Sequence, residues 1–537
     1  MAQPKFSLEV LPSLGMRNDL NPAQLPQGSQ RIAYDAEMKS NDTIGKRPGT
    51  APVTDSALGS AITNLLVYKA TASSVAPELF AVSGNTLYKY SANALTAQTM
   101  TNTFVNSNVF GVGYTDFADV SNLLLTDGGN LKQYDGTQVK DVVPAPDHPS
   151  EVLPPNTLSV INARGIKYIW VFTGHVFVSD GTDLIWYSER YHYDYFPEQT
   201  QRFRFTRDND YVTGSGTSFG GLCLIPMRRG WGVISGEVTD SGTSTNVPFK
   251  ADQYLNTSNG NISSRGFAKI TYPEGQQTIA YLSDDGVHEI FDTGVNSVET
   301  NGTRQYSTRL LMKDKIDFNK YGFTDAEKSA AVAFFDSQKN QFILNINRDT
   351  AHYAFIYDTR NQEWYLWRFP WTVTSMTAFD GTVYKGTTTG HVHAFSEDLY
   401  SDWNQRGKTT GTFVDFDVIS GLINFEFTGD NSYLHYYLTE AQMFNQKSSL
   451  DIYIVYGAGV VTMDKALHNE IFVWDKTSWS EGQWANVEYT DNTNNAKRLV
   501  VHKKAKYFQR RWRNNRDEPC IILKEKFLGT TSNRNAR

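Results

Sequence analysis

Short apolar runs broken by turn residues dominate the chain from Leu65 to Phe395. Five segments read as an apolar strand, a tight turn and a second apolar strand; they span residues 79–90, 123–134, 176–187, 279–291 and 383–395. Each turn contains a glycine, usually beside Asp or Asn, and glycine supplies the positive φ that a tight hairpin requires. The pattern therefore predicts a series of antiparallel β-hairpins.

The turn glycines recur at a regular interval. Gly84, Gly128, Gly181, Gly286 and Gly390 are separated by 44, 53, 105 and 104 residues. The two long intervals each contain a further hairpin candidate, at residues 222–234 and 342–358. Seven units of about 45–55 residues predict a β-propeller with seven blades, or six if two weak units share one blade. Radial stacking lets each sheet cover the face of its neighbour, which a lone four-stranded sheet cannot do.

The flanking regions follow other patterns, and the whole chain is predicted to be all-β. Frequent Pro and Gly predict an irregular N-terminal segment, residues 1–60, that packs on the propeller or on a neighbour. The propeller is expected at 61–402. Alternating runs at 413–418, 433–438 and 451–456 predict a C-terminal β-sandwich-like domain at 403–528, which docks an adaptor or neighbour. Residues 529–537 are expected to be a flexible tail.

One short helix is expected at residues 324–332. Thr324 can cap its first turn, and Glu327 stands three residues later, as in a capping box.

Composition narrows the class of protein. Of 537 residues, 40% are hydrophobic and 13% aromatic, and an aromatic excess suits strands. No apolar run of about 18 residues occurs, so we expect no stable membrane insertion, and the first residues lack the pattern of a signal peptide. With Cys223 and Cys520 as the only cysteines, a disulfide framework and a Cys-rich zinc site are excluded, and a protein made in the reducing cytoplasm fits best.

Charge is distributed unevenly. From Lys497 onward there are thirteen Lys and Arg against three acids, which gives +10 and leaves −17 for the first 496 residues. The candidate interface or DNA-contact residues are Lys503, Lys504, Lys506, Arg510, Arg511, Arg513 and Arg516. They form a solvated strand face that acids elsewhere balance, or they contact an acidic partner or a polyanion. Docking to a neighbouring ring is our prediction, with DNA contact as the alternative.

Candidate motifs for catalysis and cofactor binding fail on spacing. Gly407-Lys408-Thr409 lacks the upstream glycine of a phosphate loop, and His391 and His393 share a strand face without a third metal ligand. The Ser-Asp-Gly turns are shorter than a sialidase Asp-box and are interpreted as turns. The aromatic run 191–197 is interpreted as buried between blades rather than as a stacking platform. We therefore predict a protein that is not an enzyme and has no catalytic residues, cofactor or metal.

The order of segments resembles the tail nozzle proteins of short-tailed bacteriophages, also called packaged-DNA stabilisation or tail accessory proteins. Four stretches carry the resemblance: Leu14–Asp19 with Lys46–Gly49, Leu184–Pro197, Gly260–Arg265 with the hairpin at 281–287, and Val332–Trp364. It covers most of residues 14–395 and is weaker beyond.

The resemblance implies a structural role. Such proteins form rings, often sixfold, below the portal and adaptor, extend the DNA channel, retain the packaged genome and anchor the distal tail. The expected partners are copies of this chain in a hexameric ring, adaptor or portal proteins above, a fibre, spike or needle below, and double-stranded DNA in the channel. The expected location is the virion tail, assembled in the host cytoplasm. The alternative is a propeller tail protein that binds a receptor or carbohydrate and possibly hydrolyses glycan.

Overall fold

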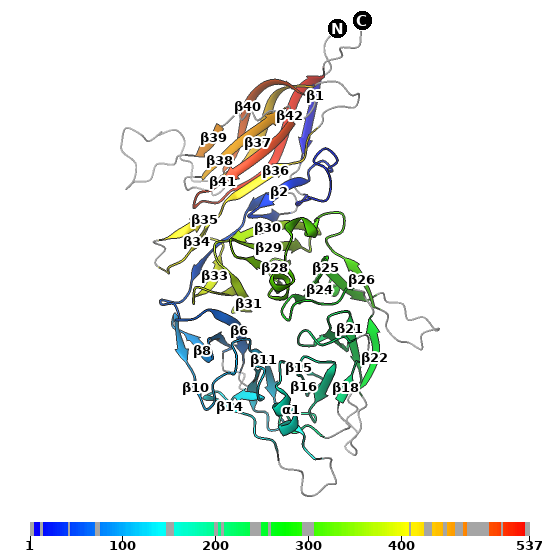
Figure 1. Cartoon of the computed structure of the whole chain (residues 1–537). Helices are drawn as coiled ribbons and strands as arrows, with labels where there is room; N and C mark the ends of the chain where they lie inside the picture. Colours follow the sequence, from blue (N-terminus) through cyan, green and yellow to red (C-terminus); the bar gives the residue numbers. More distant parts are fainter. Residues whose placement is uncertain are drawn as a thin grey trace.

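The structure is a computed structural model of the whole chain, and it is all-β with a seven-bladed propeller (Figure 1). It describes residues 5–10, 14–40, 43–69, 76–145, 155–197, 202–205, 209–236, 249–255, 259–292, 306–406, 410–423, 432–443, 448–456, 465–469, 493–505 and 508–531. The propeller lies at one end of an elongated molecule and the second β domain at the other, where both termini lie (Figure 1).

Each blade contains four antiparallel strands, which are given below in order from the innermost strand to the outermost. Blade one consists of β6 (Ile62–Tyr68), β7 (Glu78–Ser83), β8 (Thr86–Ser91) and β9 (Ala94–Ala97). Blade two consists of β11 (Phe110–Thr115), β12 (Ser121–Thr126), β13 (Lys132–Tyr134) and β14 (Gln138–Asp141), and β10 (Thr99–Met100) pairs in parallel with β14. Blade three consists of β15 (Tyr168–Phe172), β16 (His175–Ser179), β17 (Leu184–Tyr187) and β18 (Arg202–Arg204), and blade four of β19 (Thr217–Phe219), β20 (Leu222–Pro226), β21 (Trp231–Ser235) and β22 (Lys250–Leu255).

Blades five to seven complete the circle. Blade five consists of β23 (Phe267–Thr271), β24 (Gln277–Ser283), β25 (Gly286–Asp292) and β26 (Tyr306–Leu310). Blade six consists of β27 (Val332–Asp336), β28 (Gln341–Arg348), β29 (Ala351–Asp358) and β30 (Glu363–Phe369). Blade seven consists of β31 (Val373–Phe379), β32 (Thr382–Thr387), β33 (Val392–Ser396) and β5 (Gly49–Pro52). The seven-blade prediction is confirmed.

The seven predicted hairpins are the second and third strands of the seven blades, from β7–β8 to β32–β33. The turn glycines Gly84, Gly128, Gly181, Gly286 and Gly390 all have positive φ, between 55° and 137°. At Gly390 a Cβ would also lie 2.3 Å from the carbonyl oxygen of Leu58. The repeated glycines in the sequence therefore mark the same hairpin in five of the seven blades.

Separate hydrophobic clusters fill the spaces between neighbouring blades. One joins blades one and two around Phe80 and Leu123, and another joins blades three and four around Phe177 and Ile225. Other clusters lie between blades two and three, four and five, and seven and one. Because each sheet buries both faces against its neighbours, the strands carry near-continuous apolar runs rather than strict alternation.

The N-terminal segment supplies the strand that closes the circle. β5 pairs antiparallel with β33 as the outermost strand of blade seven. Blade seven therefore combines one strand that precedes blade one in the chain with three strands that follow blade six. β34 (Ser401–Trp403) then pairs in parallel with β5, and β35 (Gly411–Phe413) pairs with β34. This closure joins the beginning and the end of the propeller by backbone hydrogen bonds.

The second domain is two sheets that share one hydrophobic cluster with blades five to seven. One sheet continues blade six through β2 (Gln30–Tyr34) into β36 (Phe416–Ser420), β41 (Phe508–Asn514), β38 (Ser448–Tyr456) and β39 (Lys465–Asn469). The other contains β3 (Ala36–Ser40), β4 (Thr43–Lys46), β42 (Ile521–Thr531), β37 (Ser432–Met443) and β40 (Thr493–Ala505), with β1 (Lys5–Val10) beside β42. β2 therefore links the propeller to the sandwich within one continuous nine-stranded sheet.

The predicted boundaries need two corrections. Residues 5–10 form β1 and residues 30–52 form strands β2 to β5, so the irregular segment expected at 1–60 is wrong there and holds for the described residues 14–29 and 53–60. Pro and Gly limit the length of these strands, but pairing with existing sheet edges stabilises short ones. Residues 529–531 extend β42 and are not tail, while residues 532–537 lie outside the described part.

The helical elements are few. α2 (Asp325–Ser329) has the predicted capping box between Thr324 and Glu327. The sequence prediction missed α1 (Leu158–Arg164), which buries Leu158 and Ile161 against blades two and three, and the short 3-10 turn η2 (Phe318–Tyr321). In the described residues no helix is long and apolar enough to cross a membrane.

Candidate functional site

The basic strand β41 divides its charges between two faces. Its residues alternate between fully and partly buried, which puts Arg510 and Trp512 on the inner face and Arg511 and Arg513 on the outer one. Arg510 is fully buried, with its Nε 2.9 Å from Glu525 Oε2 and its guanidinium 3.5 Å from the Trp512 ring centroid. Arg510 is therefore wrong as an interface or DNA-contact candidate, because its charge is already compensated inside the sandwich.

The arginines on the outer face of β41 pair with two aspartates, one on β36 and one just before it. Arg511 donates two hydrogen bonds of 2.7 Å to Asp417, and Arg513 lies 3.0 Å from Asp415. The hydrogen bonds to Asp417 raise the pKa of Arg511, and the carboxylate of Asp417 balances the charge of the guanidinium. This arrangement corresponds to the interpretation of acids balancing a strand face.

The remaining basic candidates are distributed unequally. The backbone of Lys503 and Lys504 belongs to β40, paired with Leu434 and Tyr433. Lys506 lies outside the described residues, and Arg516 is exposed in the turn between β41 and β42. The contact role of these four stays a prediction.

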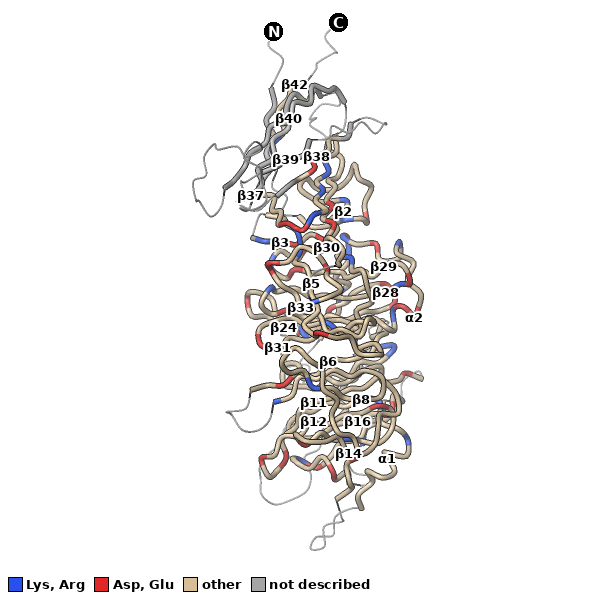
Figure 2. Tube along the Cα trace, turned by 90° about the vertical axis from the view of Figure 1, so that its left-hand side faces the viewer, with Lys and Arg blue, Asp and Glu red and all other residues tan. Residues whose placement is uncertain are grey.

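A buried ionic cluster holds the junction between propeller and sandwich, and sequence reasoning missed its members. Arg47, directly after β4, is 1% exposed and places its Nε 2.7 Å from Asp35 and its Nη2 2.6 Å from Asp402. Its Nη2 also donates to the carbonyl oxygen of Arg368 on β30 at 2.8 Å. One side chain therefore ties the N-terminal segment to blade six and to β34. Figure 2 shows basic and acidic segments side by side where β2, β3 and β30 meet.

A buried lysine lies beside this cluster. Lys385 on β32 has no exposed surface, and its Nζ lies 3.8 Å from the Phe369 ring centroid without a hydrogen-bond partner among the described residues. Burial lowers the pKa of Lys385 to about 7, despite the nearby charge of Asp402. The same environment lowers the pKa of His393, its cross-strand neighbour, to about 2. The junction therefore contains groups that burial holds near or in their neutral forms.

Of the two histidines predicted on one strand, His393 lies on β33 and His391 directly precedes it. The rings of His391 and His393 lie 6.1 Å apart, and the Nδ1 of His391 is hydrogen-bonded to Thr54. No group of three or more His, Cys, Asp or Glu side chains in the described ranges could hold a metal ion. Cys223 and Cys520 are both buried, and burial raises the pKa of each thiol to about 12.

The aromatic run at 191–197 is only partly buried between blades. Tyr195 and Phe196 are buried, as expected, but Tyr191 is 39% exposed and has a positive φ of 62°. Next to it, His192 stacks on Phe117, which is 77% exposed, with the ring centroids 6.0 Å apart. The prediction is therefore correct for the second half of the run and wrong for its first two residues.

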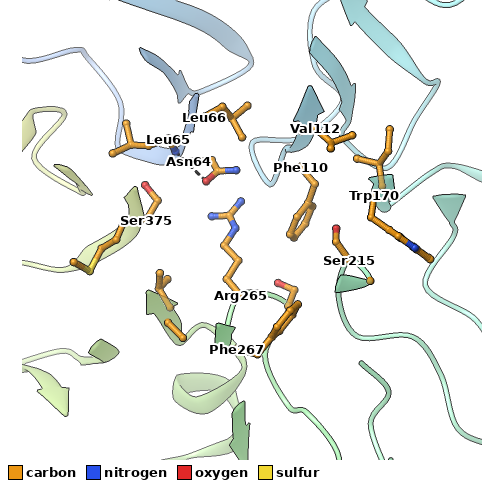
Figure 3. A pocket seen from close by; sticks show the side chains of 17 residues that line it. Asn64, Leu65, Leu66, Phe110, Val112, Trp170, Ser215, Arg265, Phe267 and Ser375 are labelled. Atoms are coloured by element: carbon orange, nitrogen blue, oxygen red, sulfur yellow. Dashed lines mark hydrogen bonds between the residues drawn. The ribbon is translucent and has the colours of Figure 1, made fainter. Parts of the chain in front are cut away.

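The propeller axis contains a cavity of about 360 Å³ to which the innermost part of every blade contributes (Figure 3). Of its lining residues, all of them described, Arg265 alone carries a charge. Arg265 precedes β23 in blade five and reaches across the axis to the carbonyl oxygens of Thr63 and Thr374, at 2.5 and 3.4 Å. It also donates to Asn108 and Val109, at 2.9 and 3.2 Å. Sequence reasoning singled out the segment that contains Arg265 but assigned it no role.

Comparison with known proteins identifies no family for this chain. No family model matches the chain, and no curated protein matches it. Among solved structures, virginiamycin B lyase from Staphylococcus aureus is 9% identical, with 65% of this chain and 98% of that chain covered and a TM-score of 0.39. BamB from Moraxella catarrhalis is 10% identical, covering 65% and 97% with a TM-score of 0.34. The computationally designed Ika8 protein is 12% identical, covering 65% and 99% with a TM-score of 0.33.

Proposed function

We propose that the chain is a structural component of the tail of a short-tailed bacteriophage, a subunit of a nozzle ring below the portal and adaptor. The observation that supports this role best is the shared sheet. β2 lies between β30 of the propeller and β36 of the sandwich, so the two domains form one hydrogen-bonded body. A subunit that transmits force between rings needs such a stiff connection, whereas domains joined by a linker move relative to one another.

The lumen of the ring, and not the axis of each propeller, carries the DNA in this proposal. Arg265 bridges blade five to Thr63 of blade one and Thr374 of blade seven, so a side chain obstructs the propeller axis. A duplex therefore has to pass between copies of the chain. Closed rings use heterologous interfaces, in which two different patches of each subunit meet. The acidic character of the first 496 residues, −17 in total, would repel phosphates from such a lumen rather than bind them.

The first test is the assembly state of the purified chain. Mass photometry and electron microscopy of the protein, alone and with the tail assembly that it belongs to, should reveal a closed ring whose lumen is wide enough for duplex DNA. Particles that lack the protein should lose packaged DNA. A stable monomer that does not bind to the tail would refute the proposal. A strongly basic lumen in the assembled ring would refute the electrostatic part alone.

The glycan-active alternative is separated by a direct assay. As an isolated chain, a hydrolytic propeller should release sugar from the host polysaccharide, and a receptor-binding propeller should bind that polysaccharide. Under our proposal the chain neither binds nor cleaves that polysaccharide, and turnover would reject the non-enzymatic role.

A further inference from the structure

The cavity on the propeller axis has the size and the composition of a ligand site. Its volume of about 360 Å³ falls in the range typical of small-molecule pockets. Phe110 and Phe267 form apolar walls on one side, and Ser215 lies beside them (Figure 3). Asn64 lies opposite the end of the Arg265 side chain (Figure 3). Apolar walls with a few convergent polar groups are the usual composition of a site that binds a small organic molecule.

The charge of Arg265 has no counter-ion in the described part of the chain. Its two terminal nitrogens donate to three backbone carbonyl oxygens and to the side-chain oxygen of Asn108, which are all neutral. Its Nε is buried and has no hydrogen-bond partner among the described residues. No carboxylate lies among the described lining residues. Arg265 is half-buried, and a partly desolvated cation without a carboxylate partner lacks the compensation that buried charges normally have.

Two further observations agree with an uncompensated charge. Burial lowers the pKa of Arg265 to about 10, whereas Arg47, flanked by two carboxylates, has a raised pKa. The guanidinium also lies 5.0 Å from the ring centroid of Phe110, a cation–π contact that holds it without neutralising it. These contacts fix the guanidinium and engage the hydrogens of both terminal nitrogens, so the Nε–H is the pre-oriented donor that is left for an anion.

We propose that the propeller axis binds a small organic anion, a molecule with one carboxylate or phosphate group and an apolar ring. The oxyanion pairs with the guanidinium of Arg265, which is the strongest recognition that this set of side chains offers. The ring packs between Phe110 and Phe267. The proposal does not depend on ring assembly, because all its residues belong to one chain.

Isothermal titration calorimetry at low salt tests the proposal with four probes. 4-Bromobenzoate and phenyl phosphate carry the two oxyanions on a ring, benzamide is the neutral analogue, and inorganic phosphate is the bare ion. Both ring anions should bind to one site, and benzamide should bind about tenfold more weakly or not at all. The stronger of the two ring anions identifies the preferred group. Tight binding of inorganic phosphate alone would contradict the role of the aromatic walls.

Matched variants separate the site from general charge effects. Arg265→Gln should weaken the binding of both ring anions about 10- to 100-fold, as expected for the loss of a charge-assisted hydrogen bond. Arg204→Gln is the control, because Arg204 is a surface arginine in a weak 3.4 Å ion pair with Asp183; its binding should equal that of the native protein. Equal binding by Arg265→Gln and the native protein would overturn the proposal.

A crystallographic measurement on the native protein covers the case in which Arg265→Gln fails to fold. The bromine of 4-bromobenzoate gives an anomalous peak that locates the ligand independently of any variant. The peak should lie in the cavity, with the carboxylate toward Arg265. A peak elsewhere with an empty cavity, or no saturable binding of either ring anion, would overturn the proposal.

Discussion

Removing Arg47 should open the junction that closes the propeller. Arg47→Met keeps most of the side-chain volume but leaves Asp402, which is 2% exposed, with the hydroxyl of Thr50 at 2.8 Å as its one remaining hydrogen-bond donor among the described residues. Asp35 is affected less, because it also pairs with Arg368 at 3.1 Å. Removing one partner of a buried ion pair typically costs about 3–5 kcal/mol, since the other charge is left uncompensated.

The assay is hydrogen exchange of the β5 peptide, followed by mass spectrometry. If β5 exchanges by local opening, a loss of about 3–5 kcal/mol corresponds to roughly 150- to 4,000-fold faster exchange of the amides of residues 49–51. Arg511→Met is the matched control: Arg511 also makes a two-fold contact with an aspartate, but it is 36% exposed, so its loss should cost about 1 kcal/mol or less. Equal protection of β5 in the native protein and in Arg47→Met would refute this reasoning.

The pH dependence provides an independent check. Burial alone would raise the pKa of Asp402, but the charge of Arg47 outweighs it and holds that pKa below its ordinary value. In the native protein this carboxylate therefore stabilises the fold above the ordinary pKa of Asp, and the contribution is lost as the pH falls through the folded pKa. Without Arg47 the folded pKa rises, so the deficit of Arg47→Met should be largest at neutral pH and should shrink in acid. Adding Asp402→Asn should likewise recover part of it.

Three further predictions concern other parts of the fold. The pKa of Lys385 in the folded protein is lowered to about 7, so above that pH the unfolded chain binds more protons than the folded one. The free energy of unfolding should therefore rise from about pH 7 to pH 10, by an amount on the order of 4 kcal/mol. Lys385→Met should remove this rise in a series of thermal denaturations at different pH. Gly49→Ala should destabilise by about 1–3 kcal/mol, because its Cβ would lie 2.2 Å from the carbonyl oxygen of Ser401, whereas Gly59→Ala, with open space around the Cβ, should stay within about 0.5 kcal/mol in the same denaturation assay. Replacing Lys503 and Lys504 by Ser should reduce ring assembly in mass photometry, and unchanged assembly with unchanged genome retention would remove both roles predicted for the basic segment.

The propeller could be predicted because its cause is local and repeated. Each blade needs a tight turn between its second and third strands, a tight turn favours glycine, and the seven blades therefore leave a period in the sequence. The capping box of α2 could be predicted for the same reason, since Thr324 and Glu327 are three residues apart. The helix α1 has no comparable signal: its N-cap residue Thr157 makes no side-chain cap hydrogen bond.

The candidate sites were harder to predict because their residues meet only in space. Arg47 and Asp402 are 355 positions apart in the chain, and Arg265 contacts Thr63 across 202 positions. The basic run shows the opposite error. A dense group of cations in the sequence indicated an exposed surface, but β41 turns Arg510 inward to Glu525 and pairs Arg511 with Asp417. Charge counted along the chain does not reveal which carboxylates another strand brings alongside.

The sequence by itself determined an all-β chain with seven equivalent hairpins, because turn chemistry and apolar strand runs act over a few neighbouring residues. Only the tertiary structure decided that the N-terminal segment completes blade seven and that β2 joins the propeller to the sandwich. It also placed Arg265 on the propeller axis, without a counter-ion among the described residues. Strand pairing between distant segments and the neutralisation of buried charge depend on which distant residues come into contact in the folded protein. A local sequence pattern does not contain that information.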